Sequence, residues 1–148
     1  MIAISHRPVG RKWNTISFAS TLYLCPILDL LLAEIPPQWQ AEVRLGLQEA
    51  LVNAAKHGNQ LDPGKTVMVR FSAKRDRYWW VICDQGNGFP CPHTCNDDPC
   101  ADVPHEEGEC GRGLFIIKQV FDEVHWNKRG RELRLCKLMN NHRLPLVR

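Results

Sequence analysis

The stretch that most constrains the fold is residues 38–57, which have the period of one long helix with two unlike sides. Residues four apart lie on the same face of an α-helix, so Glu49 and Asn53 share one side, together with Lys56 and His57. The opposite side is apolar and holds Val43, Leu47, Ala50, Leu51 and Ala54. Such a helix can form the floor of a polar site, although a merely solvated face has the same pattern. Gly58 is expected to end the helix in the left-handed conformation.

Length and composition indicate one globular domain, residues 1–148, with 44% hydrophobic residues and a sizeable core. A net charge of +3 is too small to indicate direct nucleic-acid binding. The most apolar run, residues 22–35, would span about 21 Å as a helix, less than the ~30 Å of a bilayer core. Seven cysteines without a visible export signal are expected to be reduced thiols. We therefore expect a soluble, cytoplasmic protein without a membrane segment.

The remaining segments predict alternating strands and helices. Residues 12–20 have strand composition, and a helix is expected from Pro26 to about Ile35, ended by Pro36 and Pro37. Residues 66–73 and 78–83 predict a β-hairpin, and a helix after Gly113 precedes strands over 123–127 and 132–139. This order predicts an α+β fold, a two-layer sandwich whose mainly antiparallel mixed sheet carries helices on one face. Residues 140–148 are expected to form a loose tail.

Two glycine motifs flank an irregular stretch, residues 84–113, of which about 89–112 have the character of a functional lid. The first, Asp84-Gln85-Gly86-Asn87-Gly88, directly follows a predicted strand. Alternate glycines let the backbone approach a flat ligand, and a carboxylate can accept a hydrogen bond from an exocyclic amine such as that of adenine. A plain turn at the strand end explains the same residues.

The second motif, Gly108-Glu109-Cys110-Gly111-Arg112-Gly113, precedes a predicted helix. The free amides and the positive dipole end of a helix N-terminus suit phosphate, and Arg112 adds a fixed positive charge. The motif is neither a P-loop nor a Rossmann fingerprint. A flexible hinge is the alternative explanation.

In this order, Glu-x-x-x-Asn on a helix, Asp-x-Gly-x-Gly after a strand and Gly-x-x-Gly-x-Gly before a helix resemble the N, G1 and G2 boxes of the GHKL ATPase superfamily. Residues 49–58 and 111–117, with the small size of the chain, are most similar to the anti-sigma-factor serine/threonine kinases. The resemblance covers about Trp13 to Leu138 and implies the GHKL (Bergerat) ATPase fold. No substrate-histidine helix accompanies these motifs, which argues against a histidine kinase.

The resemblance also implies roles for single residues. Asn53 would be the protein ligand to Mg²⁺, and Glu49 would polarise the attacking nucleophile, which is a serine hydroxyl in the kinases. Asp84 would bind the adenine amine. The residues that would shape the adenine pocket are Gly86 and Gly88, and those that would hold the phosphates are Gly108, Gly111, Arg112 and Gly113, with Lys56 within reach. His57 is expected to be a packing or capping residue.

The function that the resemblance implies is an ATP- and Mg²⁺-dependent serine/threonine protein kinase that acts as an anti-sigma factor. It would bind a sigma factor and phosphorylate a serine on an anti-anti-sigma antagonist of the STAS type. Family members tend to be dimeric, which is compatible with a homodimer. One alternative is a nucleotide-gated binding module of the same fold without kinase activity.

A further alternative, a metal- or redox-responsive regulator, rests on the cysteines of the predicted lid. Cys91, Cys95 and Cys100, with His93, His105 and Cys110 nearby, could hold Zn²⁺ through thiolates and imidazoles. Their spacing differs from a Cys-x2-Cys knuckle, and the family needs no such metal. Reduced thiols without a special role are the preferred explanation of these residues.

Overall fold

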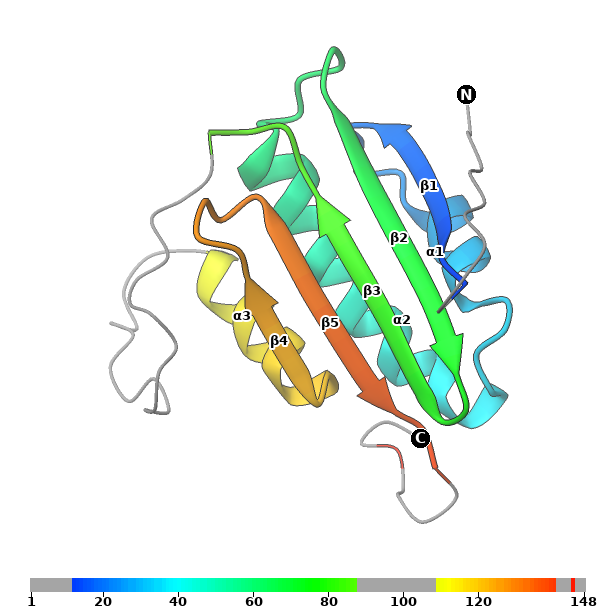
Figure 1. The fold of residues 1–148 in the computed structure, drawn as a ribbon. Helices are drawn as coiled ribbons and strands as arrows, with labels where there is room; N and C mark the ends of the chain where they lie inside the picture. Colours follow the sequence, from blue (N-terminus) through cyan, green and yellow to red (C-terminus); the bar gives the residue numbers. More distant parts are fainter. Residues whose placement is uncertain (1–11, 88–108, 141–144, 146–148) are drawn as a thin grey trace.

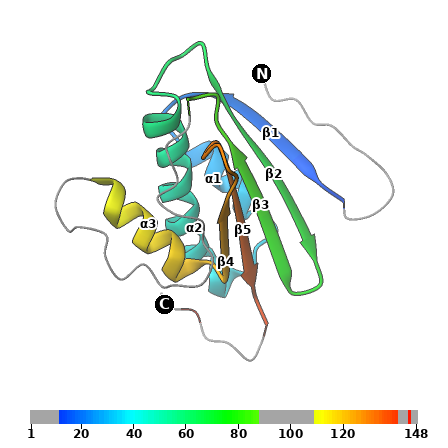
Figure 2. The ribbon, with the colours of Figure 1, turned by 60° about the vertical axis from the view of Figure 1, so that its left-hand side comes forward.

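The computed structural model describes residues 12–87, 109–140 and 145, with Glu109 and Cys110 as backbone only. Within these residues the sheet has five strands in the order β1-β2-β3-β5-β4, and each pairing is antiparallel. The helices lie together on one face of it (Figures 1 and 2). This arrangement confirms the predicted two-layer α+β sandwich. The elements are, in chain order, β1 (Asn14–Ala19), α1 (Cys25–Leu32), α2 (Pro37–Val52), η1 (Asn53–Gly58), β2 (Thr66–Lys74), β3 (Arg77–Cys83), α3 (Glu109–Val120), β4 (Glu123–Trp126) and β5 (Glu132–Leu138).

The core lies between the sheet and the helices, because alternate strand residues point to the helical layer. On β3 these are Trp80 and Ile82, which are 1% and 2% exposed. The Trp80 ring meets Phe121 edge to face, with ring centroids 5.6 Å apart. The other buried residues of this layer include Val67 and Val69 on β2, Leu133 and Leu135 on β5, and Val43, Leu47 and Leu51 on α2.

The helix boundaries differ from the sequence prediction at three places. The helix expected to reach Ile35 ends at Leu32, and Pro37 is the first residue of α2, since a first helical turn does not use the missing amide of proline. The long helix is α-helical only to Val52 and continues as the π-helix η1, where the Asn59 amide donates to the Ala54 carbonyl at 2.9 Å. The helix expected after Gly113 already begins at Glu109.

A buried ion pair joins the two layers at the end of the sheet where β5 finishes. The Lys137 ammonium on β5 donates to the Glu42 carboxylate of α2 at 2.5 Å and to the carbonyl of Val120, the last residue of α3. It also lies 5.1 Å from the centroid of the Trp39 ring. One side chain therefore contacts two helices from the sheet.

Candidate functional site

The pairing of β3 with β5 places Asp84 beside Arg131. Cys83 pairs with Glu132 at the end of this ladder, and the next step is the hydrogen bond from the Asp84 amide to the Arg131 carbonyl at 3.0 Å. Because side chains alternate along a strand, Asp84 and Arg131 face the helices, as Ile82 and Leu133 do. The carboxylate thus enters the space between the sheet and the end of the long helix.

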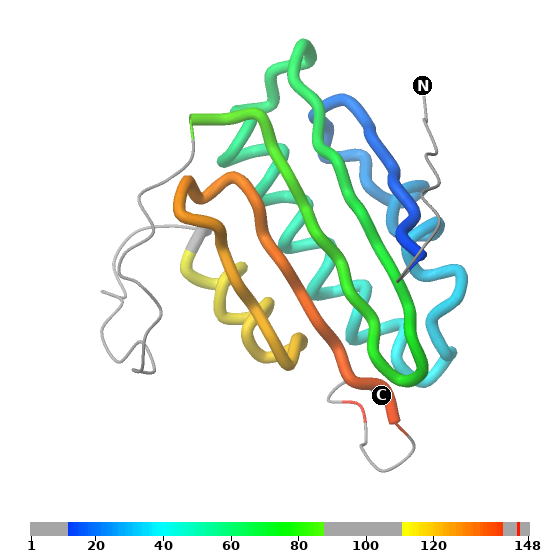
Figure 3. The backbone as a smooth tube through the Cα atoms, viewed as in Figure 1, coloured from blue at the N-terminus to red at the C-terminus, as the bar shows by residue number. Residues whose placement is uncertain are grey.

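A small cavity of about 30 Å³ occupies that space. Its walls come from segments far apart in the sequence: the end of the long helix, the end of β3, and the β4–β5 turn, which gather at one end of the molecule in Figure 3. An engineered cavity that admits benzene measures roughly 150 Å³, so a nucleobase requires the walls to move apart. The lining residues are Ala50, Asn53, Ala54, Gly58, Ile82, Asp84, Trp126, Gly130, Arg131 and Leu133.

Glycines at 58 and 86 are required by the close approach of Asp84 to the end of η1. A Cβ on Gly58 would lie 2.4 Å from Cγ of Asp84, and one on Gly86 would lie 1.9 Å from the Gly58 carbonyl oxygen. The expectation that Gly58 closes the helix in the left-handed conformation is wrong, because Gln60 and Leu61 take that conformation, with φ of 54° and 55°. Gly58 instead leaves room for the carboxylate.

The electrostatic environment of Asp84 contains opposing influences. Burial raises the pKa of its carboxyl group from the ordinary value, while the hydrogen bond from the Gly86 amide, at 2.8 Å, and the charges of Arg131 and Lys65 lower it. A half-buried carboxyl supported by one amide and two cations is chemically suited to bind a hydrogen-bond donor such as an amine.

Asn59, which the sequence analysis did not identify as a site residue, fixes the loop after Asp84. Its side chain is fully buried. The amide nitrogen donates to the Ser20 hydroxyl and the Thr66 carbonyl, both at 2.9 Å, and the amide oxygen accepts from the Gln85 backbone at 2.7 Å. Asn59 therefore connects the end of η1 to the Asp84 loop and to the β1–β2 edge. Its position directly after Gly58 was the available signal.

The start of α3 lies against Glu49 and Asn53. A Cβ on the buried Gly113 would stand 3.0 Å from Oε2 of Glu49 and 3.6 Å from the side-chain amide of Asn53. Glycine at this position lets the first turns of α3 reach the polar side of the long helix. The structure therefore brings together Glu49, Asn53 and Gly113, and Asn53 also lines the cavity that holds Asp84.

Some of the other predicted site residues do not line the cavity at Asp84, and some lie outside the described residues. Gly111 and Arg112 are exposed in the first turns of α3, so they belong to the helix and not to a preceding loop. Lys56 is partly buried on η1 and does not line the cavity, and His57 is exposed. The predicted lid residues Gly88 and Gly108, as well as Cys91, Cys95 and Cys100, lie outside the described residues. Within the described ranges, no group of three or more His, Cys, Asp or Glu side chains could hold a metal ion.

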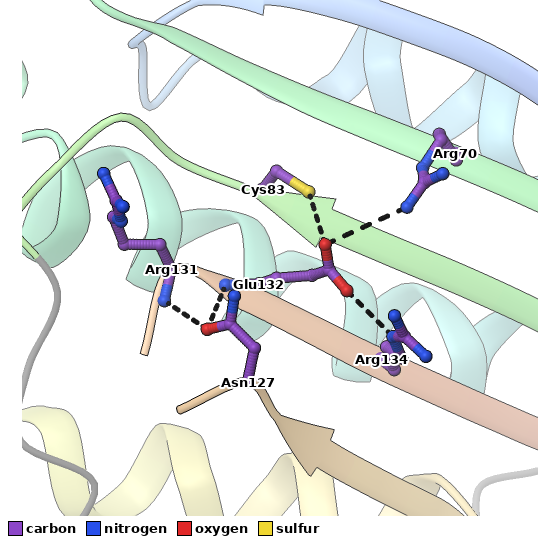
Figure 4. A network of polar contacts seen from close by, with 6 residues as sticks. All are labelled: Arg70, Cys83, Asn127, Arg131, Glu132 and Arg134. Atoms are coloured by element: carbon purple, nitrogen blue, oxygen red, sulfur yellow. Dashed lines mark hydrogen bonds and ion pairs between the residues drawn. The ribbon is translucent and has the colours of Figure 1, made fainter. Parts of the chain in front are cut away.

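The opposite face of the sheet carries a separate polar network around Glu132 (Figure 4). Its carboxylate accepts from Arg134 Nε at 2.8 Å and from the Cys83 thiol at 3.7 Å, and Arg70 lies 3.9 Å away. Burial and the negative charge of Glu132 raise the pKa of Cys83 to about 11. Cys83 adjoins Asp84 in the chain, but its protonated thiol faces away from the cavity.

A larger cavity, of about 170 Å³, lies between α1 and strands β1–β3. Its walls are mainly apolar and aromatic, including Phe71, Tyr78 and Trp80, and among the described residues Glu34 is the one charged side chain of the lining. Those residues predicted to carry chemistry that the structure describes do not line it. The smaller cavity at Asp84 is therefore the better candidate for the site. In the part of the chain that the structure describes, no helix is both apolar and long enough to span a bilayer.

The sequence is similar to those of known protein kinases. The serine-protein kinase RsbW of Bacillus subtilis (strain 168) is 26% identical over 107 residues, which cover 70% of this chain and 67% of that protein. The serine-protein kinase RsbW of Bacillus licheniformis (strain ATCC 14580) is 28% identical over 108 residues, with the same coverage. The predicted resemblance to serine kinases of this group is thereby confirmed. Residues 28–137 match the family of the histidine kinase-like ATPase domain, and because this match spans most of the chain, the protein belongs to that family.

Proposed function

We propose that the protein is an ATP- and Mg²⁺-dependent serine/threonine protein kinase that acts as an anti-sigma factor, binding a sigma factor and phosphorylating a serine of a STAS-type antagonist. The observation that carries this proposal is the meeting of Glu49, Asn53 and the first turns of α3 at Gly113. A carboxylate and an amide beside the first turns of a helix would supply a base and a metal ligand, and the free amides at the start of that helix, one turn before Gly113, would supply a site for phosphate. The kinase relatives support the same assignment.

The donor set fits an adenine nucleotide with Mg²⁺. Asp84 would accept a hydrogen bond from the adenine amine, and the Asn53 oxygen would be a ligand to the metal. The α3 amides and the Arg112 guanidinium would attract the phosphates, with Lys56 as a further cation at the end of the helix. Gly88 and Gly108 would complete the two glycine motifs.

The chemistry required of the protein is mainly positioning. ATP, bound with Mg²⁺, supplies the phosphoryl group that a serine hydroxyl accepts. Glu49 would orient this hydroxyl and take its proton, a role that requires direct hydrogen-bond contact or one bridging water. The start of α3 and Arg112 would balance negative charge, and because α3 packs on α2, these groups keep a fixed relation to Glu49.

Two substitutions distinguish a role in phosphoryl transfer from a role in binding ATP and Mg²⁺. Glu49→Gln should reduce phosphotransfer by roughly 10²–10⁴-fold, as expected for a positioned base, while ATP affinity stays near that of wild type. Asn53→Ala should weaken Mg²⁺–ATP binding roughly tenfold or more, since a lost contact to a charged partner costs about 1.5–3 kcal/mol. Calorimetric titration with ATP, with and without Mg²⁺, and labelled-phosphate transfer to partners captured from the source cell measure these effects.

The controls decide whether the protein is a kinase or a nucleotide-gated binding module without kinase activity. In the presence of EDTA, wild type and Asn53→Ala should bind ATP alike; a difference that persists without metal would remove Asn53 as the ligand. If wild type binds ATP but yields no phosphoserine on any captured partner, the kinase assignment fails and a nucleotide-gated binding module takes its place. If Glu49→Gln loses ATP affinity as well, Glu49 is a binding residue and not the base.

A further inference from the structure

A cavity of about 170 Å³ between the end of α1 and the β2–β3 hairpin takes no part in the proposed function. It lies beside Tyr78 near the start of β3, whereas Asp84 follows the other end of that strand (Figure 1). A cavity of roughly 150 Å³ lined by apolar side chains admits benzene. This cavity therefore has room for one six-membered ring without movement of its walls.

The walls of this cavity are aromatic rings from the sheet and aliphatic side chains from α1 and the residues after it. Phe71, Tyr78 and Trp80 face the helices from β2 and β3. The Tyr78 and Trp80 rings are stacked, with centroids 6.3 Å apart and an interplanar angle of 18°. Leu31 and Ile35 line the helical side, and they are 3% and 5% exposed. This slot suits a planar apolar ring, which gains from both burial and stacking.

The small size of Ala73 keeps the slot open. Ala73 pairs with Tyr78 in the β2–β3 register and lines the cavity from the sheet. Its side chain is a single methyl group, and the residue is exposed. A larger side chain at this position would therefore occupy the slot without disturbing a buried residue.

One edge of the cavity is negatively charged. Glu34, which follows α1, is exposed there and is the one charged side chain of the lining among the described residues. Burial raises the pKa of the Tyr78 hydroxyl, and the charges of Asp76 and Glu34 raise it further, so this hydroxyl is protonated at neutral pH. Lys74 and Arg77, which end β2 and begin β3, face the other side of the sheet, since side chains alternate along a strand. The edge of the cavity therefore suits a positive charge.

We propose that this cavity binds a small organic cation that carries one aromatic ring and an ammonium group on a short chain. The ring enters the slot between α1 and the sheet, and the ammonium group donates hydrogen bonds to the Glu34 carboxylate and the Tyr78 hydroxyl. A neutral analogue keeps the contacts of the ring but loses the ion pair, and an anionic analogue is repelled by Glu34. Because the cavity is separate from the one at Asp84, this inference does not depend on the proposed function.

The test titrates the full chain at neutral pH with three probes of similar size, 2-phenylethylamine, 2-phenylethanol and 3-phenylpropionate, and follows the tryptophan indole N–H signals by NMR. Binding in the cavity should shift the signal of Trp80, while Trp126, which lines the cavity at Asp84, serves as the reference. Because Glu34 is exposed, its ion pair should favour the amine over the alcohol by up to about fivefold. The anionic 3-phenylpropionate should bind most weakly.

Three variants make the result specific. Glu34→Gln should bind the amine and the alcohol alike. Asp29→Asn, which removes an exposed carboxylate of α1 that does not line the cavity, should keep the wild-type preference. Ala73→Leu fills the slot and should abolish binding of all three probes, with a melting temperature near that of wild type.

Four outcomes would overturn the proposal. They are the absence of a saturable shift at Trp80, equal affinity of wild type for the three probes, a preference for the amine that persists in folded Glu34→Gln, and wild-type binding by Ala73→Leu. A shift confined to Trp126 counts as the first of these, because the probes would then bind at the Asp84 cavity.

Discussion

The half-buried position of the Asp84 carboxyl group favours its protonated form, so ionisation of this group lowers the stability of the fold. Its pKa is raised from 3.8, first by burial, so the folded protein binds a proton more tightly than the unfolded chain. The stabilisation from this proton is present below the ordinary pKa and is lost as the pH rises through the raised value. At neutral pH the carboxylate therefore lowers the free energy of unfolding, a cost that the proposed role of Asp84 in binding a nucleotide would explain.

Asp84→Asn should lower the affinity for ATP without lowering the stability of the fold. The asparagine oxygen can still accept from the Gly86 amide, so the melting temperature without nucleotide at pH 8 should be equal to or above that of wild type. ATP affinity should fall roughly tenfold or more, because the acceptor loses its charge. Thermal melts and calorimetry test this, with exposed Asp76→Asn as the control. A clearly lower melting temperature would mean that the carboxylate stabilises the fold.

At the residue scale, the sequence analysis identified the residues that belong to local motifs. It missed those that only the pairing of strands brings to the cavity. Glu49, Asn53, Asp84 and Gly113 belong to short patterns, and the structure brings them to one end of the molecule. Arg131 is 47 positions from Asp84, and its place depends on the β3–β5 register. No local periodicity encodes the partner of a strand, so this wall of the cavity could not be predicted.

At the scale of elements, the period of each segment predicted the strands and helices, but not how they end. The π-helical turn and the early start of α3 occur where elements meet, with Asp84 against Gly58 and Glu49 against Gly113. Glycine weakens a helix, so local propensity alone favours a loop over residues 108–113. Packing of α3 against α2 overrides that preference.

The position of α3 can be tested with two glycines of its first turns. Alanine at Gly111, where no group of the described residues lies within 4 Å of the place that the added Cβ would take, should raise stability by up to about 1 kcal/mol through helix propensity. Gly113→Ala should gain less, or lose stability, because its Cβ meets Glu49 Oε2 at 3.0 Å. Urea unfolding measures both free energies. In a Glu49→Ala background the two variants should become alike, and an unchanged difference would show that Glu49 is not the contact.

At the scale of the whole molecule, a charged pair in the core fixes the relation between the two layers. Glu42 is 0% and Lys137 6% exposed, although both types are normally surface residues. Lys137 reaches α2 through Glu42 and the end of α3 through Val120. The start of that same α3 lies at Glu49, so the pair sets the far end of the helix whose first turns form the candidate site.

Removing one charge of this pair should destabilise the entire fold, whereas replacing both charged residues with apolar ones should destabilise it less. Lys137→Met leaves the Glu42 carboxylate buried without its ammonium partner, which should cost about 3–5 kcal/mol in the free energy of unfolding. Glu42→Met with Lys137→Met removes both charges from the core and should be more stable than either single variant. Urea denaturation of wild type, the two single variants and the double variant gives the coupling energy. Arg44→Met, which removes an exposed ion pair with Asp29, serves as the control and should cost about 0–1 kcal/mol. If the double variant is as unstable as the sum of the singles, the two charges are not coupled, and Lys137 acts through Val120 alone.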